Sequence, residues 1–192
     1  MRSALFLSFL LLSGTAIAQP SQQPAPKAAP KPKSVESEAG LLAQLKKADS
    51  AEAAKPIEEK LAVLYRASGS PSIDLLMTRA RAAAASDKAA AKKLINAVTT
   101  IAPRYAEGWR TRAALESEAG DDAAAMVSLQ KAVQLNPRHF MAMVELGDLL
   151  QDYGDKAQAL KLYRQAAVLN PQMEGVERRI RELTRAVEGQ DI

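Results

Sequence analysis

The sequence predicts an all-α fold in which antiparallel helical hairpins stack into an α-solenoid. Four prolines mark a period, because Pro71, Pro103, Pro137 and Pro171 recur at a nearly constant spacing. A period of about 34 residues is typical of stacked repeats, in which each unit packs on its neighbours. Each period also holds two amphipathic stretches of about 12 to 14 residues, the length of an ordinary helix.

The last two periods, residues 106–139 and 140–173, align without a gap. Gly120 and Gly154 interrupt them at the same place, where a left-handed residue can end one helix before the next begins. Small residues recur where two helices would approach closely, and larger apolar residues recur between them. The signature positions are Trp109, Ala113, Gly120, Ala125, Ala132 and Pro137 in the first period, and Leu146, Gly147, Gly154, Ala159, Tyr163, Ala166 and Pro171 in the second.

This pattern resembles the tetratricopeptide repeat family, which the second period matches at nearly every signature position. The resemblance implies a right-handed superhelix of hairpins whose concave side holds peptides or partner helices. Residues 72–105 are interpreted as a degenerate repeat, which departs from the pattern at Arg79. Arg112 and Glu116 stand where apolar groups are usual, so we expect them to reach solvent or to pair with each other.

The segments on either side of the repeats are expected to act as caps. Residues 38–71 contain two short apolar patterns and are predicted to form an N-terminal capping hairpin. Residues 174–188 carry apolar residues along one helical face and are predicted to form a capping helix on the last repeat. Residues 189–192 are left as a tail.

Residues 1–18 have the three parts of a cleavable signal peptide. Arg2 precedes an apolar run that ends at Leu12, and the small-residue triplet Ala16-Ile17-Ala18 follows. The run is much shorter than the ~20 apolar residues of a membrane span, so an uncleaved anchor is the weaker alternative. We expect cleavage after Ala18 and export to a bacterial periplasm.

Residues 19–37 are expected to form an extended tether. Five of the ten prolines and no acidic residue lie between Gln19 and Lys33. Four of the 26 basic residues precede Ser34, which leaves 22 basic against 22 acidic residues in the rest of the chain. The sequence pI near 9.3 therefore does not indicate a basic nucleic-acid-binding face. Contact between the tether and an anionic envelope surface stays an open alternative.

The composition excludes most catalytic and metal-binding chemistry. The chain has no Cys and a single His, so it has no thiol nucleophile and no Cys or His metal cluster. We expect His139 to be an exposed turn residue, the acidic residues of the hairpin turns to cap helices, and aromatic residues to fill the core. These acidic and aromatic residues are Asp121, Asp122, Asp152 and Asp155, and Trp109, Tyr153 and Tyr163. No catalytic residue, metal or cofactor is predicted, and the chain is interpreted as a non-enzyme.

The concave positions that the resemblance implies fall on the first helix of each repeat. They are Glu107, Arg110, Ala114 and Ser117 in one repeat and Met141, Val144, Asp148 and Asp152 in the next, with Ala80 and Ala84 in the degenerate one. Such a groove is small and apolar at one end and acidic at the other. It would favour an extended or helical segment with an apolar anchor and a basic group. The alternative is that these residues form a solvated face.

We therefore interpret the chain as a periplasmic adaptor that binds a partner protein or peptide through this groove. It is expected to be a monomer or a weak homo-oligomer without a transmembrane segment. Two alternatives stay open. One is a structural or assembly factor of the cell envelope that acts by self-association or through the tether, and the other is an accessory subunit of an envelope biogenesis system.

Overall fold

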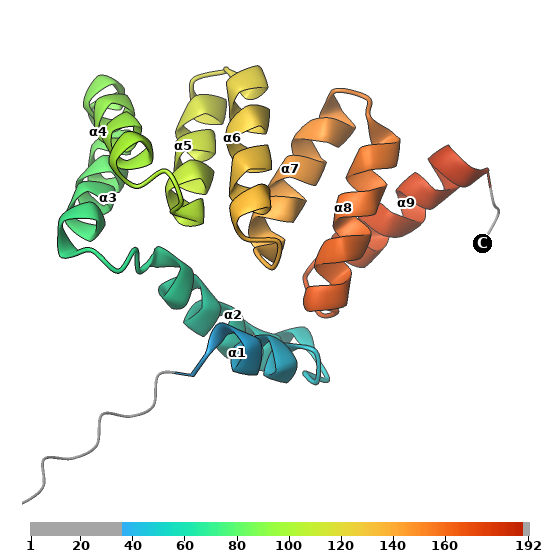
Figure 1. The fold of residues 1–192 in the computed structure, drawn as a ribbon. Helices are drawn as coiled ribbons and strands as arrows, with labels where there is room; N and C mark the ends of the chain where they lie inside the picture. The colour runs from blue at the N-terminus through green and yellow to red at the C-terminus, as the bar shows by residue number, and fades with distance from the viewer. Residues whose placement is uncertain (1–35, 190–192) are drawn as a thin grey trace, which may run out of the picture. The chain divides into compact units, whose positions relative to one another are not determined.

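The computed structural model describes residues 36–189, and the predicted signal peptide and nearly all of the tether lie outside this range. The described residues form helices and no strand, in agreement with the predicted all-α fold. The helices are α1 (Glu38–Leu45), α2 (Ala51–Arg66), α3 (Pro71–Ala84), α4 (Lys88–Ile101), α5 (Ala106–Glu118), α6 (Asp122–Leu135), α7 (Phe140–Asp152), α8 (Lys156–Leu169) and α9 (Val176–Glu188). Helices α3 to α8 form three successive antiparallel hairpins (Figure 1). None of the described helices is both long and apolar enough to cross a membrane.

Local signals in the sequence set the ends of the hairpin helices. Asp87, Asp121 and Asp155 are the N-caps of α4, α6 and α8, and each carboxylate accepts the backbone N–H three residues later at 2.9 to 3.1 Å. Gly120 and Gly154 adopt φ angles of +77° and +90° in the turns just before two of these caps. Left-handed glycines therefore follow two of the first helices, α5 and α7, and capping carboxylates begin all three second helices.

The pairing of α7 with α8 shows why a small residue is needed at position 147. A Cβ atom on Gly147 would lie 2.8 Å from Cε1 of Tyr163, which is closer than real carbon contacts. Tyr163 is fully buried, and its hydroxyl donates to Oδ1 of Asp148 at 2.6 Å. The predicted match of a small residue with a large ring thus has a steric basis.

Apolar side chains form three clusters along the described residues. One lies between α3 and α4 and contains Ile73, Met77, Ala80, Ile95 and Val98. A second joins α5, α6 and α7 and contains Ala113, Ala125, Leu129, Ala132, Ala142 and Leu146. The third joins α1 and α2 to α7, α8 and α9, which are distant in sequence. The last cluster therefore holds the two ends of the described chain together.

The pair α1–α2, which we call the N-terminal hairpin, is not an N-terminal cap of the kind predicted for residues 38–71. Its buried residues Leu45 and Leu61 share a cluster with Phe140 of α7, and none of its residues belongs to the cluster of α3 and α4. In Figure 1 it lies along the ends of α5 to α8. The physical reason is that α7, α8 and α9 offer a continuous apolar surface, which the N-terminal hairpin removes from water.

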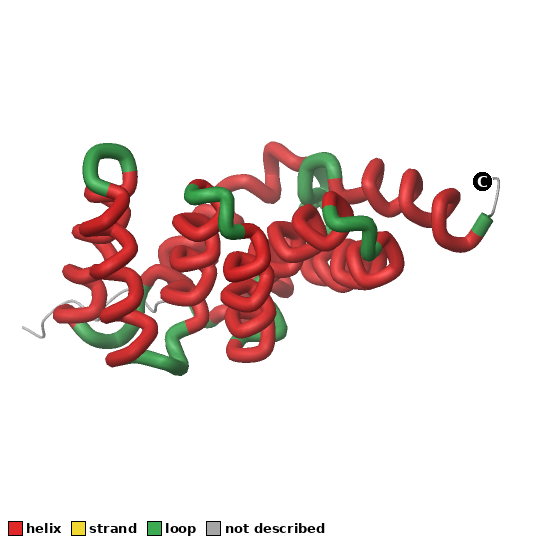
Figure 2. Tube along the Cα trace, turned by 90° about the horizontal axis from the view of Figure 1, so that it is seen from above, coloured by secondary structure: helices red, strands yellow, loops and turns green. Residues whose placement is uncertain are grey.

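Helix α9 lies within residues 174–188, the segment for which a C-terminal capping helix is predicted. It packs on α8 through the buried residues Val176 and Leu183, whereas Arg178 and Arg181 are exposed on its outer side. Figure 2 shows this helix beside the C-terminal mark, after the paired helices and their short loops. The apolar end of the array is thus closed by a helix with a charged outer face.

Replacement of Gly147 by Leu is expected to lower the free energy of unfolding by about 1 to 3 kcal/mol, because the new side chain overlaps the buried ring of Tyr163. Thermal denaturation followed by circular dichroism measures this change. Ala123→Leu, on the exposed surface of α6, is the control and should change stability by no more than about 0.5 kcal/mol. Equal losses in the two variants would contradict the close packing of Gly147 on Tyr163.

Candidate functional site

A cleft opens between α3 and α5, the first helices of two successive repeats. It has a volume of about 220 Å³, and we call it the α3–α5 cleft. Its lining consists of Arg81 and Ala84 from α3 and of Glu107, Arg110, Thr111, Ala114, Leu115 and Glu118 from α5. Four predicted groove residues, namely Ala84, Glu107, Arg110 and Ala114, therefore lie together here. Ala80 does not, because it is fully buried in the cluster of α3 and α4.

One buried carboxylate organises the wall of the α3–α5 cleft. Glu107 is only 5% exposed. Its oxygens lie 3.0 Å from Nη2 of Arg81 on α3, 3.2 Å from Nη1 of Arg110 on α5, and 3.1 Å from Nε2 of His139 at the start of α7. Burial alone would raise the pKa of the Glu107 carboxyl, but the His139 hydrogen bond and the Arg110 charge outweigh it and lower the pKa. Glu107 is thus a charged link between three successive repeats.

Arg110 extends this link to the body of α7. Its Nε donates to both carboxylate oxygens of Glu145, at 2.9 and 3.0 Å, while Nη1 faces Glu107. Burial would lower the pKa of the Arg110 guanidinium, but the charges of Glu145 and Glu107 outweigh it and raise the pKa above its ordinary value. Arg110 is therefore held between two carboxylates and forms part of the fixed wall.

His139 is fully buried, so the expectation of an exposed turn residue is wrong. Its ring stacks on Tyr65 of α2 with the centroids 4.4 Å apart and an interplanar angle of 24°. Nδ1 accepts the backbone N–H of Ala142 and caps α7, so Nε2 is the nitrogen that carries a hydrogen toward Glu107. The N-terminal hairpin is the reason for the burial, because its Tyr65 covers the turn in which His139 lies.

The predicted groove residues on α7 are mostly occupied by contacts within the chain. Met141 and Val144 belong to the apolar cluster that the N-terminal hairpin closes, and Val144 is buried. Asp148 accepts the Tyr163 hydroxyl and lies 3.3 Å from Nε of Arg179 on α9. Three of the four groove residues predicted on α7 are thus engaged by other parts of the chain.

Two further predicted groove residues lie at helix ends, away from the α3–α5 cleft. Ser117 is exposed near the end of α5, and its hydroxyl donates to Oδ1 of Asp122 at 2.8 Å. Asp152 is exposed as the last residue of α7, so it does not cap the start of a helix as expected. Neither residue lines the cleft.

The charged pair predicted on α5 forms, and two of the three aromatic residues expected in the core lie there. Arg112 and Glu116 do pair, with Nε 2.7 Å from Oε1. Trp109 and Tyr163 pack in the core as expected. Tyr153 does not, because its side chain is exposed and its hydroxyl donates to Asp122 at 3.2 Å. Its position, the first turn residue after α7, explains this exposure.

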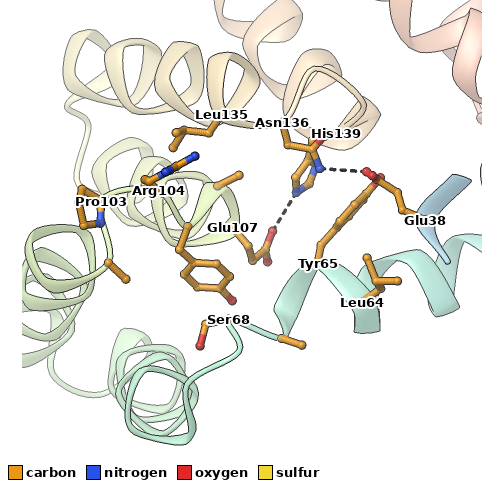
Figure 3. Close-up of a pocket in the computed structure, with 14 residues that line it drawn as sticks. Glu38, Leu64, Tyr65, Ser68, Pro103, Arg104, Glu107, Leu135, Asn136 and His139 are labelled. Atoms are coloured by element: carbon orange, nitrogen blue, oxygen red, sulfur yellow. Dashed lines mark hydrogen bonds and ion pairs between the residues drawn. The ribbon is translucent and has the colours of Figure 1, made fainter. Parts of the chain in front are cut away.

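A second cavity, of about 630 Å³, lies where α2 leads toward α3 (Figure 3). Tyr65, Tyr105 and His139 line it together with Glu107, which also lines the α3–α5 cleft. Burial and the Glu107 charge raise the pKa of the Tyr105 hydroxyl to about 12, and this hydroxyl donates to the carbonyl of Arg66 at 2.7 Å. Among residues 36–189, no group of three or more His, Asp or Glu is placed to hold a metal ion.

No pattern in the sequence indicated the contacts that Arg81 and His139 make with Glu107. The sequence indicates only the ion pair of Glu107 with Arg110, because residues at i and i+3 lie close together on one helix. Arg81 and His139 lie 26 and 32 residues from Glu107, so their approach depends on how successive hairpins stack.

Replacement of Glu107 by Gln is expected to destabilise the fold by about 1 to 3 kcal/mol at neutral pH, because Arg81 and Arg110 lose a charged acceptor. The folded-state pKa of Glu107 lies below its ordinary value of 4.5. Its contribution to stability is therefore complete above that value and is lost as the pH falls through the folded-state pKa. Denaturation at a series of pH values should show the wild-type advantage shrinking in acid.

The matched control for this experiment is Glu182→Gln, which removes an exposed carboxylate lying 3.9 Å from Arg178. This surface pair should contribute no more than about 1 kcal/mol. A Glu107→Gln effect that stays constant down to acid unfolding, or that equals the effect of the control, would contradict the role of Glu107 as a buried charged link.

Solved structures similar to this chain agree on its fold. No protein-family model and no curated protein matches the sequence. The TPR domain of Sgt2 from Aspergillus fumigatus matches with a TM-score of 0.55 and 24% identity over 62% of this chain and 81% of that one. The first TPR of Spaghetti (RPAP3) gives 0.55 and 17% over 60% and 93%, and MamA gives 0.55 and 16% over 78% and 81%. The chain therefore has the α-solenoid fold of tetratricopeptide-repeat proteins.

Proposed function

We propose that the chain is a non-catalytic interaction module that holds a segment of a partner protein in the α3–α5 cleft. The observation that carries this proposal is that small side chains stand open to solvent between fixed charged groups. Ala114 is exposed and Ala84 is half-buried, while Glu107 and Arg110 beside them already satisfy each other. An apolar side chain of a partner would remove both alanines from water without breaking the ion pairs of the wall.

The exposed charges of the cleft suggest which polar groups would flank this anchor. Glu118 lines the cleft and is exposed, so it is placed to meet a basic group of the partner. The sequence-based preference for a basic group rested on Asp148 and Asp152, but Asp148 is engaged by Tyr163 and Arg179. We therefore assign that preference to Glu118. Charge pairs of this exposed kind contribute more to the choice of partner than to affinity.

Similar solved structures support an interaction role by analogy. The Spaghetti (RPAP3) domain is described as bound to an HSP90 peptide, and the TPR2B domain of yeast Sti1 is described in a complex with pHsp70. Their sequences are 17% and 20% identical to this chain. We take from them the general mode of action, which is to hold a segment of another protein, and not the identity of the partner.

We also propose that this module acts in the periplasm. The support lies in residues 1–18, where one cation, a short apolar run and a small-residue triplet ending at Ala18 follow one another. The proline-rich stretch after Ala18 would then separate the helical array from the new N-terminus.

A photoreactive amino acid at position 114 is expected to form a covalent adduct with the partner in living cells, because this position faces the α3–α5 cleft. The same residue at position 123, on the exposed surface of α6, is the matched control and should not form that adduct. Gel mobility and mass spectrometry measure the product. The same adduct at both positions, or none at position 114, would contradict the proposed site.

The exported chain is expected to begin at Gln19, because the small residues before it form the cleavage site. Mass spectrometry of the protein from the periplasmic fraction measures this end. Ala18→Arg should block processing and leave the full-length chain, whereas Ala28→Arg, within the tether, should leave it unchanged. A wild-type protein that keeps residues 1–18 would overturn the proposed export.

A further inference from the structure

The N-terminal hairpin meets the repeats through two equivalent asparagines. Nδ2 of Asn136, after α6, donates to Oε1 of Glu38 on α1 at 3.1 Å. Nδ2 of Asn170, after α8, donates to Oε1 of Glu58 on α2. Asn136 and Asn170 each directly precede the proline that marks the period, so two successive repeats bind a carboxylate with the same amide.

Both amides are oriented by their own turns. Oδ1 of Asn136 accepts the backbone N–H of Arg138 at 2.9 Å, and Oδ1 of Asn170 accepts that of Gln172 at 3.2 Å. This bond fixes the plane of the amide and leaves Nδ2 directed at the N-terminal hairpin. The equivalent residue of the first repeat is Ala102, which has no amide. Carboxylate binding at this position therefore begins with the second repeat.

Apolar contacts complete the surface around the two amides. Glu38 is followed by Leu41, Leu42 and Leu45 at i+3, i+4 and i+7, which places all four side chains on one face of α1. The three leucines are buried in the cluster that includes Phe140. This surface thus accepts an amphipathic helix in which a glutamate lies one turn before a pair of leucines.

Helix α1 of the N-terminal hairpin depends on this surface for its own order. Helix α1 has eight residues, fewer than an isolated helix needs in water. The hairpin is joined to α3 by residues 67–70, where Gly69 has a φ of +80° and no atom within 4 Å of a Cβ position. Folding of α1 is therefore coupled to its docking, and part of the contact energy is spent on ordering it. A preformed helix would not carry this cost.

We propose that the surface of α7, α8 and α9 marked by Asn136 and Asn170 is a docking site for an acidic amphipathic helix of a partner protein. On binding, the partner helix displaces the N-terminal hairpin, which occupies this surface within the chain. This inference rests on the proposed function, that the chain is an interaction module, and adds a second surface to the α3–α5 cleft. The partner is defined by its chemistry: glutamates that meet the two amides, and leucines that enter the apolar cluster.

The test uses the full chain and a fluorescein-labelled synthetic peptide of residues 36–66. Binding is followed by fluorescence anisotropy. The double variant Glu38→Gln/Glu58→Gln keeps the shape of the hairpin but weakens its hold on the amides. It should bind the peptide about tenfold more tightly than the wild-type chain does, because the competing intramolecular contact is weaker. Glu59→Gln, an exposed position on the same helix, is the matched control and should bind like the wild type.

Two exchanges then test whether the amides recognise carboxylates. A peptide with Gln at positions 38 and 58 should bind the Glu38→Gln/Glu58→Gln chain about tenfold more weakly than the Glu peptide does. Asn136→Asp/Asn170→Asp keeps the Oδ1 acceptor of each turn but replaces the donor by a carboxylate, so this chain should reject the Glu peptide and prefer the Gln peptide. Circular dichroism verifies that each chain is folded. Because the first exchange alters only the peptide, it remains decisive if the Asp variant does not fold.

Three outcomes would overturn the proposal. They are equal affinity for the Glu and Gln peptides, no gain in affinity on weakening the hairpin, and a doubling of the mass of the Glu38→Gln/Glu58→Gln chain without peptide binding. The last outcome would make a second copy of the chain the occupant. Photocrosslinking through position 114 is independent of these measurements. If the peptide measurements contradict the docking site but position 114 still crosslinks to the partner, the proposed interaction function is retained and only the docking site is lost.

Discussion

The stacking of the repeats depends on the buried carboxylate of Glu107. In an α-solenoid each repeat contacts only its neighbours, so the relative placement of successive hairpins rests on few contacts. The Glu107 carboxylate contacts Arg81 of the preceding hairpin α3–α4, Arg110 of its own helix, and His139 at the start of the following hairpin α7–α8. A charge taken out of water is costly unless its partners are in place. The carboxylate therefore penalises any slip of one hairpin against the next, which apolar packing alone would tolerate more easily.

The repeat architecture could be predicted because its determinants are local and recur. Gly147 and Tyr163 lie within one hairpin, and the capping residues Asp121 and Asp155 lie one period apart, so each aligned position in the sequence carries the same packing requirement. The pair Arg112 and Glu116 was predictable for the same reason, since i and i+4 residues meet on one helix face. Helix ends, small residues and local ion pairs thus follow from the sequence.

The placement of the N-terminal hairpin could not be predicted in this way. Glu38 and Asn136 are 98 residues apart, and Glu58 and Asn170 are 112 apart, so no local pattern joins them. The placement of the N-terminal hairpin also affects the contacts of Glu107 in the wall of the α3–α5 cleft. His139 lies in the turn before α7, where the ring of Tyr65 stacks on it and its Nε2 faces Glu107. Of the predicted groove residues, Glu107, Arg110 and Ala114 of α5 line the α3–α5 cleft, whereas Met141 and Val144 of α7 belong to the apolar cluster that includes the N-terminal hairpin.

The two surfaces of this chain differ in availability for a simple thermodynamic reason. The α3–α5 cleft has no occupant within the described chain, so its apparent affinity for a ligand equals its intrinsic affinity. The surface marked by Asn136 and Asn170 is also bound by the N-terminal hairpin, which competes with any partner. A short covalent linker such as residues 67–70 gives this competitor an effective concentration on the order of millimolar. The apparent affinity of this surface is reduced by the fraction of chains in which the hairpin is docked. Because the hairpin also stacks on His139, its release would remove Tyr65 from the ring that binds Glu107. Occupation of the second surface would in this way alter the wall of the first, through contacts already present between them.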